Sequence, residues 1–227
     1  MANAIGALAM GAVQKANSGH PGMPMGMADV AAVGLALAER MAAARFPGLV
    51  DHFTDVIAGD GCLMEGISHE AADRTGHLGL GRQIVLWDDD KITIDGATAL
   101  STSTDQKAGF ATYGWNVVGC DAHDVVSIAV AKADSGPSLI ACRSVFGHGA
   151  PDKQGEHDVH GAPLWAEDFA AARAHLGWTA EPFVSPEPIR AAWAKVATRK
   201  ASEMALQVVA GALPFVVVGR QTRRDRT

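Results

Sequence analysis

Hydrophobic and polar residues in the first 46 positions follow the spacing of α-helices. In residues 2–19 the apolar side chains recur three and four positions apart, which predicts a helix. These side chains are Ile5, Leu8, Ala9, Ala12 and Val13. The stretch 17–19 (NSG) ends the pattern and leaves His20 in a loop. Residues 27–46, rich in alanine and leucine, predict a second helix, although Gly34 weakens its middle by about 1 kcal/mol relative to alanine.

Beyond residue 50 the pattern changes to short apolar runs that are rich in β-branched residues, which is typical of strands. The four runs are HFTDVIAG (52–59), RQIVLWDDD (82–90), WNVVGC (115–120) and SLIACRSVF (138–146). Helical or loop-like stretches separate them, and residues 64–81 predict one helix that is closed by glycines.

Strands that alternate with helices predict an α/β fold, a doubly wound parallel sheet with helices on both faces, because parallel neighbours need crossover connections. Ligands of such sheets bind outside the carboxyl ends of the strands. The segments 59–61 (GDG) and 88–90 (DDD) both fall at such ends. The only candidate boundary is a helical, proline-marked tail that begins near residue 185.

Composition narrows the class of protein. The chain has 227 residues, 48% of them hydrophobic, which suffices for a globular core. A net charge of −6 argues against a nucleic-acid-binding protein. No stretch is long and apolar enough to span a bilayer and no secretory signal is visible, so the cytoplasm is the expected compartment. Three cysteines without C-x-x-C spacing are expected to be reduced and structural.

Asp60 and Asp90 are the residues expected to bind a ligand, and they lie one strand-helix-strand unit apart. Two adjacent parallel strands would therefore deliver both carboxylates to one edge of the sheet. Mg²⁺ is usually bound by one or two carboxylates together with substrate phosphates, so a metal-bridged diphosphate is the hypothesis. Flanking glycines would let the chain turn sharply and leave room for a ligand. The alternative is that Asp60 merely caps a helix that begins near Leu63.

Longer motifs add a family resemblance. The segments GDGCLMEGISHEA (59–71) and LGLGRQIVLWDDDKITIDG (78–96) closely resemble the diphosphate-binding segment of transketolase. Other stretches match that family in the same order: AVQKANSGHPGMPMGMAD (12–29), ATYGWNVV (111–118), AHDVVSIAVAKA (122–133), GEHDVHGAPL (155–164) and TRKASEMAL (198–206). Together they cover nearly the whole chain.

The resemblance implies a thiamine-diphosphate enzyme that moves a two-carbon ketol unit from a ketose phosphate to an aldose phosphate in the pentose phosphate pathway. Asp60, Asp90 and the backbone carbonyl of Ile92 would bind Mg²⁺ or Ca²⁺, and Gly59 and Gly61 would lie against the cofactor. The family has asparagine at position 90. Two unit charges about 4 Å apart interact by roughly 4 kcal/mol at an effective dielectric near 20, so aspartate is expected to weaken cofactor binding.

Other residues also take expected roles from the resemblance. His20 and His160 match histidines that line the substrate channel, and His160 also contacts the cofactor. Glu65 and Glu70 match acidic residues at the dimer interface, although an ordinary solvated helix face explains them equally well.

Residues outside the matched roles have simpler expectations. His157 and His160 form an H-x-x-H pair without a convincing third ligand, so zinc is not expected. Packing is the expected role of Cys62, and Trp87, Trp115 and Trp165 are expected in the core or an interface.

Parts of the family pattern are missing. The chain lacks a long insert near residues 31–32, which in the family carries the SNGHGS and GPLGQG loops. We expect residues 1–196 to be a shortened diphosphate-binding domain, and residues 197–227 to be the start of a pyrimidine-binding domain with a divergent basic tail. No residue matches the glutamate that activates the cofactor's pyrimidine ring.

This gap leaves several functions open. The chain alone is expected to be inactive. Its expected partner is a second copy in a homodimer or a polypeptide that supplies a pyrimidine-binding domain, and only the latter could restore a complete active site. The alternatives are a non-catalytic remnant that binds metal and diphosphate or only dimerises, and, least favoured, a metal-dependent phosphohydrolase.

Overall fold

The computed structural model describes residues 28–48, 50–130 and 136–195, and its centre is a four-stranded parallel sheet in the order β1-β2-β6-β5. The strands are β1 (Thr54–Gly59), β2 (Gln83–Asp88), β5 (Asn116–Asp121) and β6 (Ser138–Arg143). All four predicted strand segments are confirmed. A two-stranded antiparallel hairpin, β3 (Ile92–Thr93) with β4 (Gly96–Ala97), follows β2.

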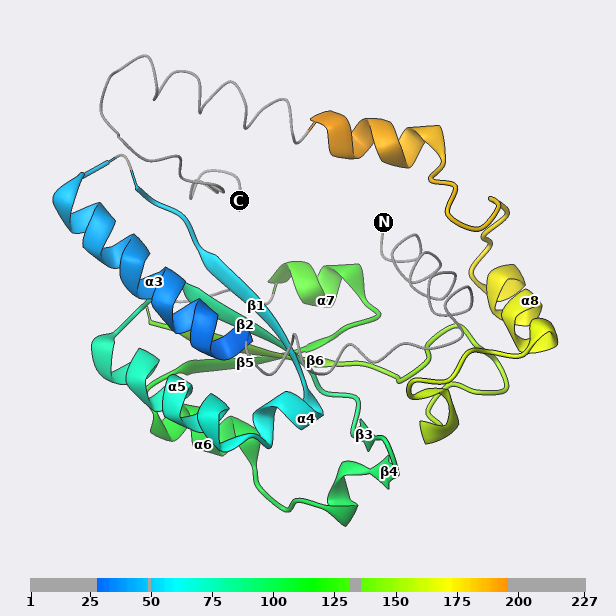
Figure 1. Cartoon of the computed structure of the whole chain (residues 1–227), viewed down its shortest axis with the longest axis horizontal. Helices are drawn as coiled ribbons and strands as arrows, with labels where there is room; N and C mark the ends of the chain where they lie inside the picture. The colour runs from blue at the N-terminus through cyan, green and yellow to red at the C-terminus, as the bar shows by residue number, and fades with distance from the viewer. Residues whose placement is uncertain (1–27, 49, 131–135, 196–227) are drawn as a thin grey trace.

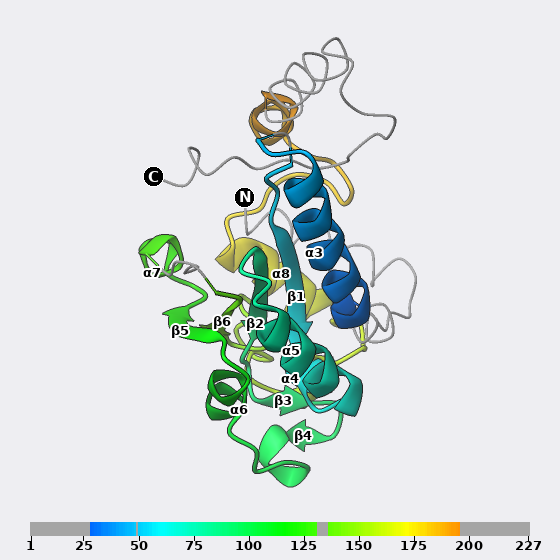
Figure 2. The ribbon, with the colours of Figure 1, turned by 90° about the vertical axis from the view of Figure 1, so that its left-hand side faces the viewer.

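Helices connect the strands, as the sequence predicts (Figure 1). They are α3 (Ala28–Arg45), α4 (Asp60–Leu63), α5 (Gly66–Leu78), α6 (Gln106–Thr112), α7 (Val125–Val130) and α8 (Ala166–His175), with 3₁₀ turns η1 (Thr98–Leu100) and η2 (His157–Val159). Residues 187–195 are also helical and begin directly after Pro186. In both ribbon views, β5 lies between α6 and α7 (Figures 1 and 2). Within the described ranges, every helix is too short or too polar to cross a lipid bilayer.

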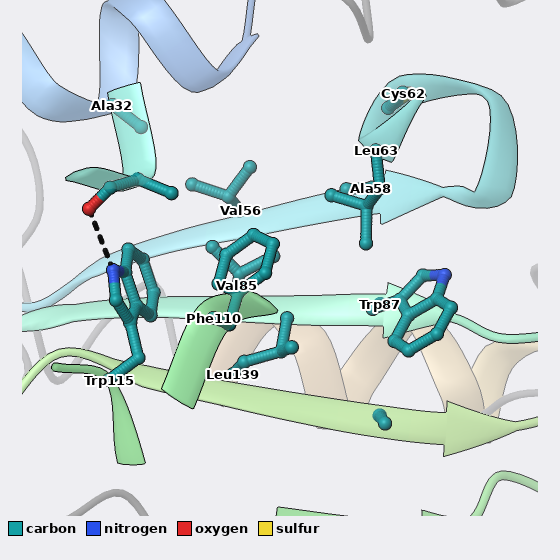
Figure 3. Close-up of a cluster of buried hydrophobic side chains, with 12 residues drawn as sticks. Ala32, Val56, Ala58, Cys62, Leu63, Val85, Trp87, Phe110, Trp115 and Leu139 are labelled. Atoms are coloured by element: carbon teal, nitrogen blue, oxygen red, sulfur yellow. Dashed lines mark hydrogen bonds between the residues drawn. The ribbon is translucent and has the colours of Figure 1, made fainter. Parts of the chain in front are cut away.

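The main hydrophobic core lies between one face of the sheet and the helices α3, α5 and α6 (Figure 3). Alternate strand residues point into it because successive side chains of a strand face opposite sides. The members are Ala32, Val56, Ala58, Cys62, Leu63, Ala72, Val85, Trp87, Phe110, Trp115, Leu139 and Ala141. The packing roles expected for Cys62, Trp87 and Trp115 are confirmed, whereas Trp165 is 79% exposed, so a core position for it is wrong.

The other face of the sheet has a smaller buried cluster of Ile84, Cys120 and Ile140. Cys120 and Cys142 lie opposite each other on β5 and β6, and all three cysteines of the chain are free thiols, as predicted. Ile57 is 64% exposed in the middle of the edge strand β1. This side chain therefore leaves apolar surface uncovered on the face of the sheet that carries the smaller cluster.

Helix α3 runs without a break through residues 31–32, where the sequence analysis expects an insert to be missing. Alanine-rich sequence on both sides of the join favours helix, so the two pieces continue as one element. Its buried Glu39 is 3.3 Å from Arg82, and Arg40 donates hydrogen bonds of 2.6 Å to the carbonyls of Leu78 and Gly79 at the end of α5. These contacts fix α3 against the β1–β2 unit.

The close approach of α5 to the end of α6 generates a stability prediction at Gly76. A Cβ atom built on Gly76 would lie 1.8 Å from the backbone oxygen of Tyr113, whereas a Cβ on Gly34 in α3 would meet nothing within 4 Å. We expect Gly76→Ala to lower the free energy of unfolding by at least about 2 kcal/mol. The matched variant Gly34→Ala should raise it by about 0.5–1 kcal/mol. Urea unfolding of both variants checks this, and equal effects would contradict the packing at Gly76.

Candidate functional site

The carboxyl ends of β1 and β2 lie level with each other, because Gly59 pairs with Asp88 in the parallel register. Asp60 follows β1 directly and Asp90 follows β2 by two residues. Their carboxyl groups are close enough to share a hydrogen bond. The predicted meeting of Asp60 and Asp90 at one edge of the sheet is therefore confirmed.

Asp60 is buried, with 8% of its surface exposed, and both of its carboxyl oxygens accept hydrogen bonds. The indole Nε1 of Trp87 donates to Oδ1 at 3.0 Å, and the backbone amide of Lys91 donates to Oδ2 at 2.7 Å. Burial raises the pKa of Asp60, while these two hydrogen bonds and the charge of Lys91 act in the opposite direction. The carboxylate is thus held in a fixed orientation at the strand end.

The alternative that Asp60 is only a helix cap is wrong. Asp60 is the first residue of α4, whose N-cap is Gly59, and no side chain caps this helix. The carboxyl oxygens of Asp60 instead bind donors from β2 and the segment after it.

The three consecutive aspartates at the end of β2 have three different surroundings. Asp88 accepts a hydrogen bond from the hydroxyl of Ser144. Asp89 is 3% exposed and forms an ion pair with Lys91, and Arg143 binds its backbone oxygen at 3.0 Å. Only Asp90 of the three has Asp60 as a hydrogen-bond neighbour that raises its pKa.

The pKa of Asp90 is raised to about 7, and burial is the largest cause. A 2.7 Å hydrogen bond from the amide of Ile92 lowers this pKa, whereas the negative charges of Asp88 and Asp60 and the hydrogen bond with Asp60 contribute to raising it. A carboxyl group with such a pKa is stabilised in its charged form by a nearby cation.

The glycines around Asp60 do not make the sharp turn that the sequence suggested. Gly59 has φ −90°, which any residue can adopt, and neither Gly59 nor Gly61 has a positive φ. The left-handed residue at this edge is Lys91, with φ 67°. Gly61 still leaves space, since a Cβ there would meet no atom within 4 Å. The open space beside Gly61 is therefore compatible with the predicted approach of a ligand to the main chain.

Of the two predicted histidines, only His160 is among the described residues, and it lies on a different segment from Asp60 and Asp90. His20 lies outside the described residues. His160 follows η2, and its ring stacks on Phe146 with centroids 5.2 Å apart. His157 is 3.5 Å from the carboxylate of its neighbour Asp158. The place of His160 beside a cofactor stays a prediction, as does that of His20.

Glu65 and Glu70 are both exposed, at the start and on the outer surface of α5. This position is compatible with a subunit interface and with a solvated helix face, so both readings stay open. In the part of the chain that the structure describes, no group of three or more His, Cys, Asp or Glu side chains is arranged to hold a metal ion by itself.

Two residues of the site were missed by the sequence reasoning. Trp87 was expected in the core or an interface, yet its indole N–H also binds Asp60. Lys91 was given no role, yet its backbone amide also binds Asp60. Both interactions join residues about thirty positions apart, and they depend on the strand register. The sequence carries only one weak signal for them, a tryptophan directly before the aspartates.

Residues 1–33 and 30–208 match a family model for the thiamine diphosphate binding domain of transketolase. The two segments meet where the sequence analysis places the missing insert, and the second extends beyond residue 196.

Individual relatives agree with the family model. The chain is 43% identical over 363 residues to a transketolase from Cereibacter sphaeroides, covering 96% of this chain and 55% of that one. It therefore spans about half the length of this curated relative.

Solved structures give the same result. A mutant transketolase from Pichia stipitis in complex with xylulose-5-phosphate has TM-score 0.75 and 36% identity, covering 83% of this chain and 30% of that one. Transketolase from Leishmania mexicana has TM-score 0.71 and 37% identity, covering 83% and 30%. The α/β fold predicted from the sequence is that of these proteins.

The raised pKa of Asp90 predicts how stability changes with pH. The folded chain holds this proton up to about pH 7, whereas the ordinary pKa is 3.8, so the stabilisation is complete below about pH 4 and is lost as pH rises through 7. Asp90→Asn does not titrate, so without metal it should become more stable than the wild type as pH rises from 5 to 8. Urea unfolding across this range tests the change.

The control for this experiment is Asp73→Asn, which removes one negative charge from an exposed position of α5. If the stability difference between wild type and Asp90→Asn stays constant with pH, the raised pKa of Asp90 is wrong.

Proposed function

The chain belongs to the transketolase family, and we propose that Asp60 and Asp90 form the metal- and diphosphate-binding part of a thiamine diphosphate site. The observation that carries this proposal is the contact of the buried carboxyl group of Asp60 with the half-buried one of Asp90 at the level ends of β1 and β2. Two acidic groups this close favour a cation between them, because each charge disfavours ionisation of the other.

The residues present fit a hard divalent cation. Asp60, Asp90 and the backbone carbonyl of Ile92 would hold Mg²⁺ or Ca²⁺, and diphosphate oxygens and water would complete its coordination. Such a site needs only one or two carboxylates, so it does not require a cluster of three acidic or histidine side chains. Gly59 and the open space at Gly61 would let the diphosphate lie against the main chain.

Thiamine diphosphate supplies, when bound, the carbon nucleophile that carries a two-carbon ketol unit from a ketose phosphate to an aldose phosphate. The described residues contribute binding and orientation. Asp60 is held by two N–H donors, and Asp90 must lose its proton before it binds a cation. His20 and His160 are proposed to bind the sugar substrate, and His160 also the cofactor.

A partner is part of the proposal. None of the 227 residues can be assigned the glutamate that acts on the pyrimidine ring, so a different polypeptide with a pyrimidine-binding domain would supply that half of the site. The exposed Glu65 and Glu70 on α5 are candidates for the interface. We place the chain in the cytoplasm and in the pentose phosphate pathway, and the free state of all three cysteines is consistent with a reducing compartment.

The second candidate function is a non-catalytic remnant that binds metal and diphosphate, or only dimerises. It is favoured by the pair of carboxyl groups at the ends of β1 and β2, which could bind a cation and a diphosphate without turnover. Binding and turnover experiments separate the two functions.

The binding experiment measures the thermal unfolding midpoint with Mg²⁺, with thiamine diphosphate, and with both. We expect an increase only when both are present, since ligands stabilise the state that binds them. Asp60→Asn should abolish the increase.

Asp90→Asn is expected to have the opposite effect on the cofactor. It should tighten thiamine diphosphate binding roughly tenfold, about 1.4 kcal/mol, when measured by calorimetry, because it removes a negative charge beside the diphosphate. Unchanged or weaker binding in Asp90→Asn would refute the charge argument.

The turnover experiment uses the purified chain alone with a ketose phosphate donor and an aldose phosphate acceptor. We expect negligible ketol transfer, and partial recovery when a protein with an intact pyrimidine-binding domain is added. A midpoint shift without recovery favours the binding remnant. Ketol transfer by the chain alone would mean that it contains a complete active site.

A further inference from the structure

Trp87 combines a core position with a contact to the proposed metal ligand. Its side chain is 2% exposed and packs between the sheet and α4, near Ala58 and Leu63 (Figure 3). The indole Nε1 donates to Oδ1 of Asp60 at 3.0 Å. A phenylalanine would fill much of the same volume but could not donate this hydrogen bond.

Trp87 also affects the second oxygen of Asp60, through Lys91. The backbone amide of Lys91 donates to Oδ2 at 2.7 Å, and Lys91 adopts a left-handed conformation that is uncommon for a residue with a side chain. Its ammonium group lies 4.8 Å from the centroid of the Trp87 ring and forms an ion pair with the buried Asp89. The ring face of Trp87 and the charge of Asp89 thus hold Lys91 where its amide reaches Asp60.

Both oxygens of Asp60 are therefore oriented by Trp87, one directly and one through Lys91. A carboxylate oxygen has two lone pairs, so an oxygen that accepts one hydrogen bond can still bind a cation. Removal of a residue that orients a metal-binding side chain commonly lowers the metal affinity by 10- to 100-fold.

We propose that Trp87 is a positioning residue, whose indole N–H and ring face orient the carboxylate of Asp60 for a divalent cation. The inference rests on the proposed function, because it concerns the same metal site. It goes further in assigning a role in metal affinity to a core tryptophan that touches neither the cation nor the cofactor.

Trp115 provides a matched control within the same core. It is 5% exposed, belongs to the same cluster, and donates its indole N–H to the backbone oxygen of Ala72 at 2.9 Å (Figure 3). Trp87 and Trp115 lie at opposite ends of this cluster. Replacing either by phenylalanine removes one buried hydrogen bond, but only Trp87→Phe removes one from Asp60.

The experiment measures the dissociation constant of thiamine diphosphate in the presence of Mg²⁺ by calorimetry for the wild type, Trp87→Phe and Trp115→Phe. We expect Trp87→Phe to raise the constant on the order of tenfold or more and Trp115→Phe to leave it unchanged. Both variants should lose thermal stability to a similar extent, so a general loss of stability cannot imitate the result.

The outcomes distinguish this inference from the function on which it rests. If the wild type does not bind thiamine diphosphate with Mg²⁺, both are wrong. If the wild type and both variants bind equally well, the site stands and the role of Trp87 is wrong.

A second measurement covers the case in which Trp87→Phe does not fold. In the wild type labelled with ¹⁵N-tryptophan, addition of Mg²⁺ and thiamine diphosphate should move the indole N–H resonance of Trp87 and leave that of Trp115 in place. A stationary Trp87 resonance during saturating binding would overturn the inference.

Discussion

The parallel pairing of β1 with β2 is the constraint on which the site depends. Its register sets Gly59 beside Asp88, so Asp60 and Asp90 leave the sheet at the same level. Side chains of a strand alternate between faces, and a shift of one residue would turn Trp87 away from the core that it shares with Ala58 and Val85. Burial of this apolar face thus fixes the position of the acidic groups.

Acidic groups at one edge of a sheet repel each other, and the fold offsets this repulsion with specific partners. Asp89 is buried but paired with Lys91, and Asp88 binds the hydroxyl of Ser144 on the segment after β6. Asp60 receives two N–H donors, and Asp90 receives one backbone amide. Burial and the nearby carboxylates together raise the pKa of Asp90 to about 7, so of these four carboxyl groups Asp90 keeps the largest share of uncompensated repulsion.

Helix α3 is continuous through residues 31–32, where the sequence analysis expects a missing insert, because helix-favouring sequence stands on both sides of these residues. It packs on β1 and α5, with Ala32 and Ala36 each 2% exposed. Some apolar residues remain at the surface, such as Ile57 on β1 and Met41 on α3. The packing of α3 on β1 thus supports the strand whose end carries Asp60.

The sequence by itself determined the order of strands and helices, the parallel α/β class, the family, and the meeting of Asp60 with Asp90. These features follow from hydrophobic periodicity and from motifs placed at strand ends, which are local properties of the chain. Only the tertiary structure decided that Asp60 is not a helix cap, that Lys91 rather than a glycine is left-handed, and that the N–H of Trp87 binds Asp60. The sequence reasoning missed these points because a hydrogen bond across 27 residues depends on strand register and side-chain rotamers, which no local pattern encodes.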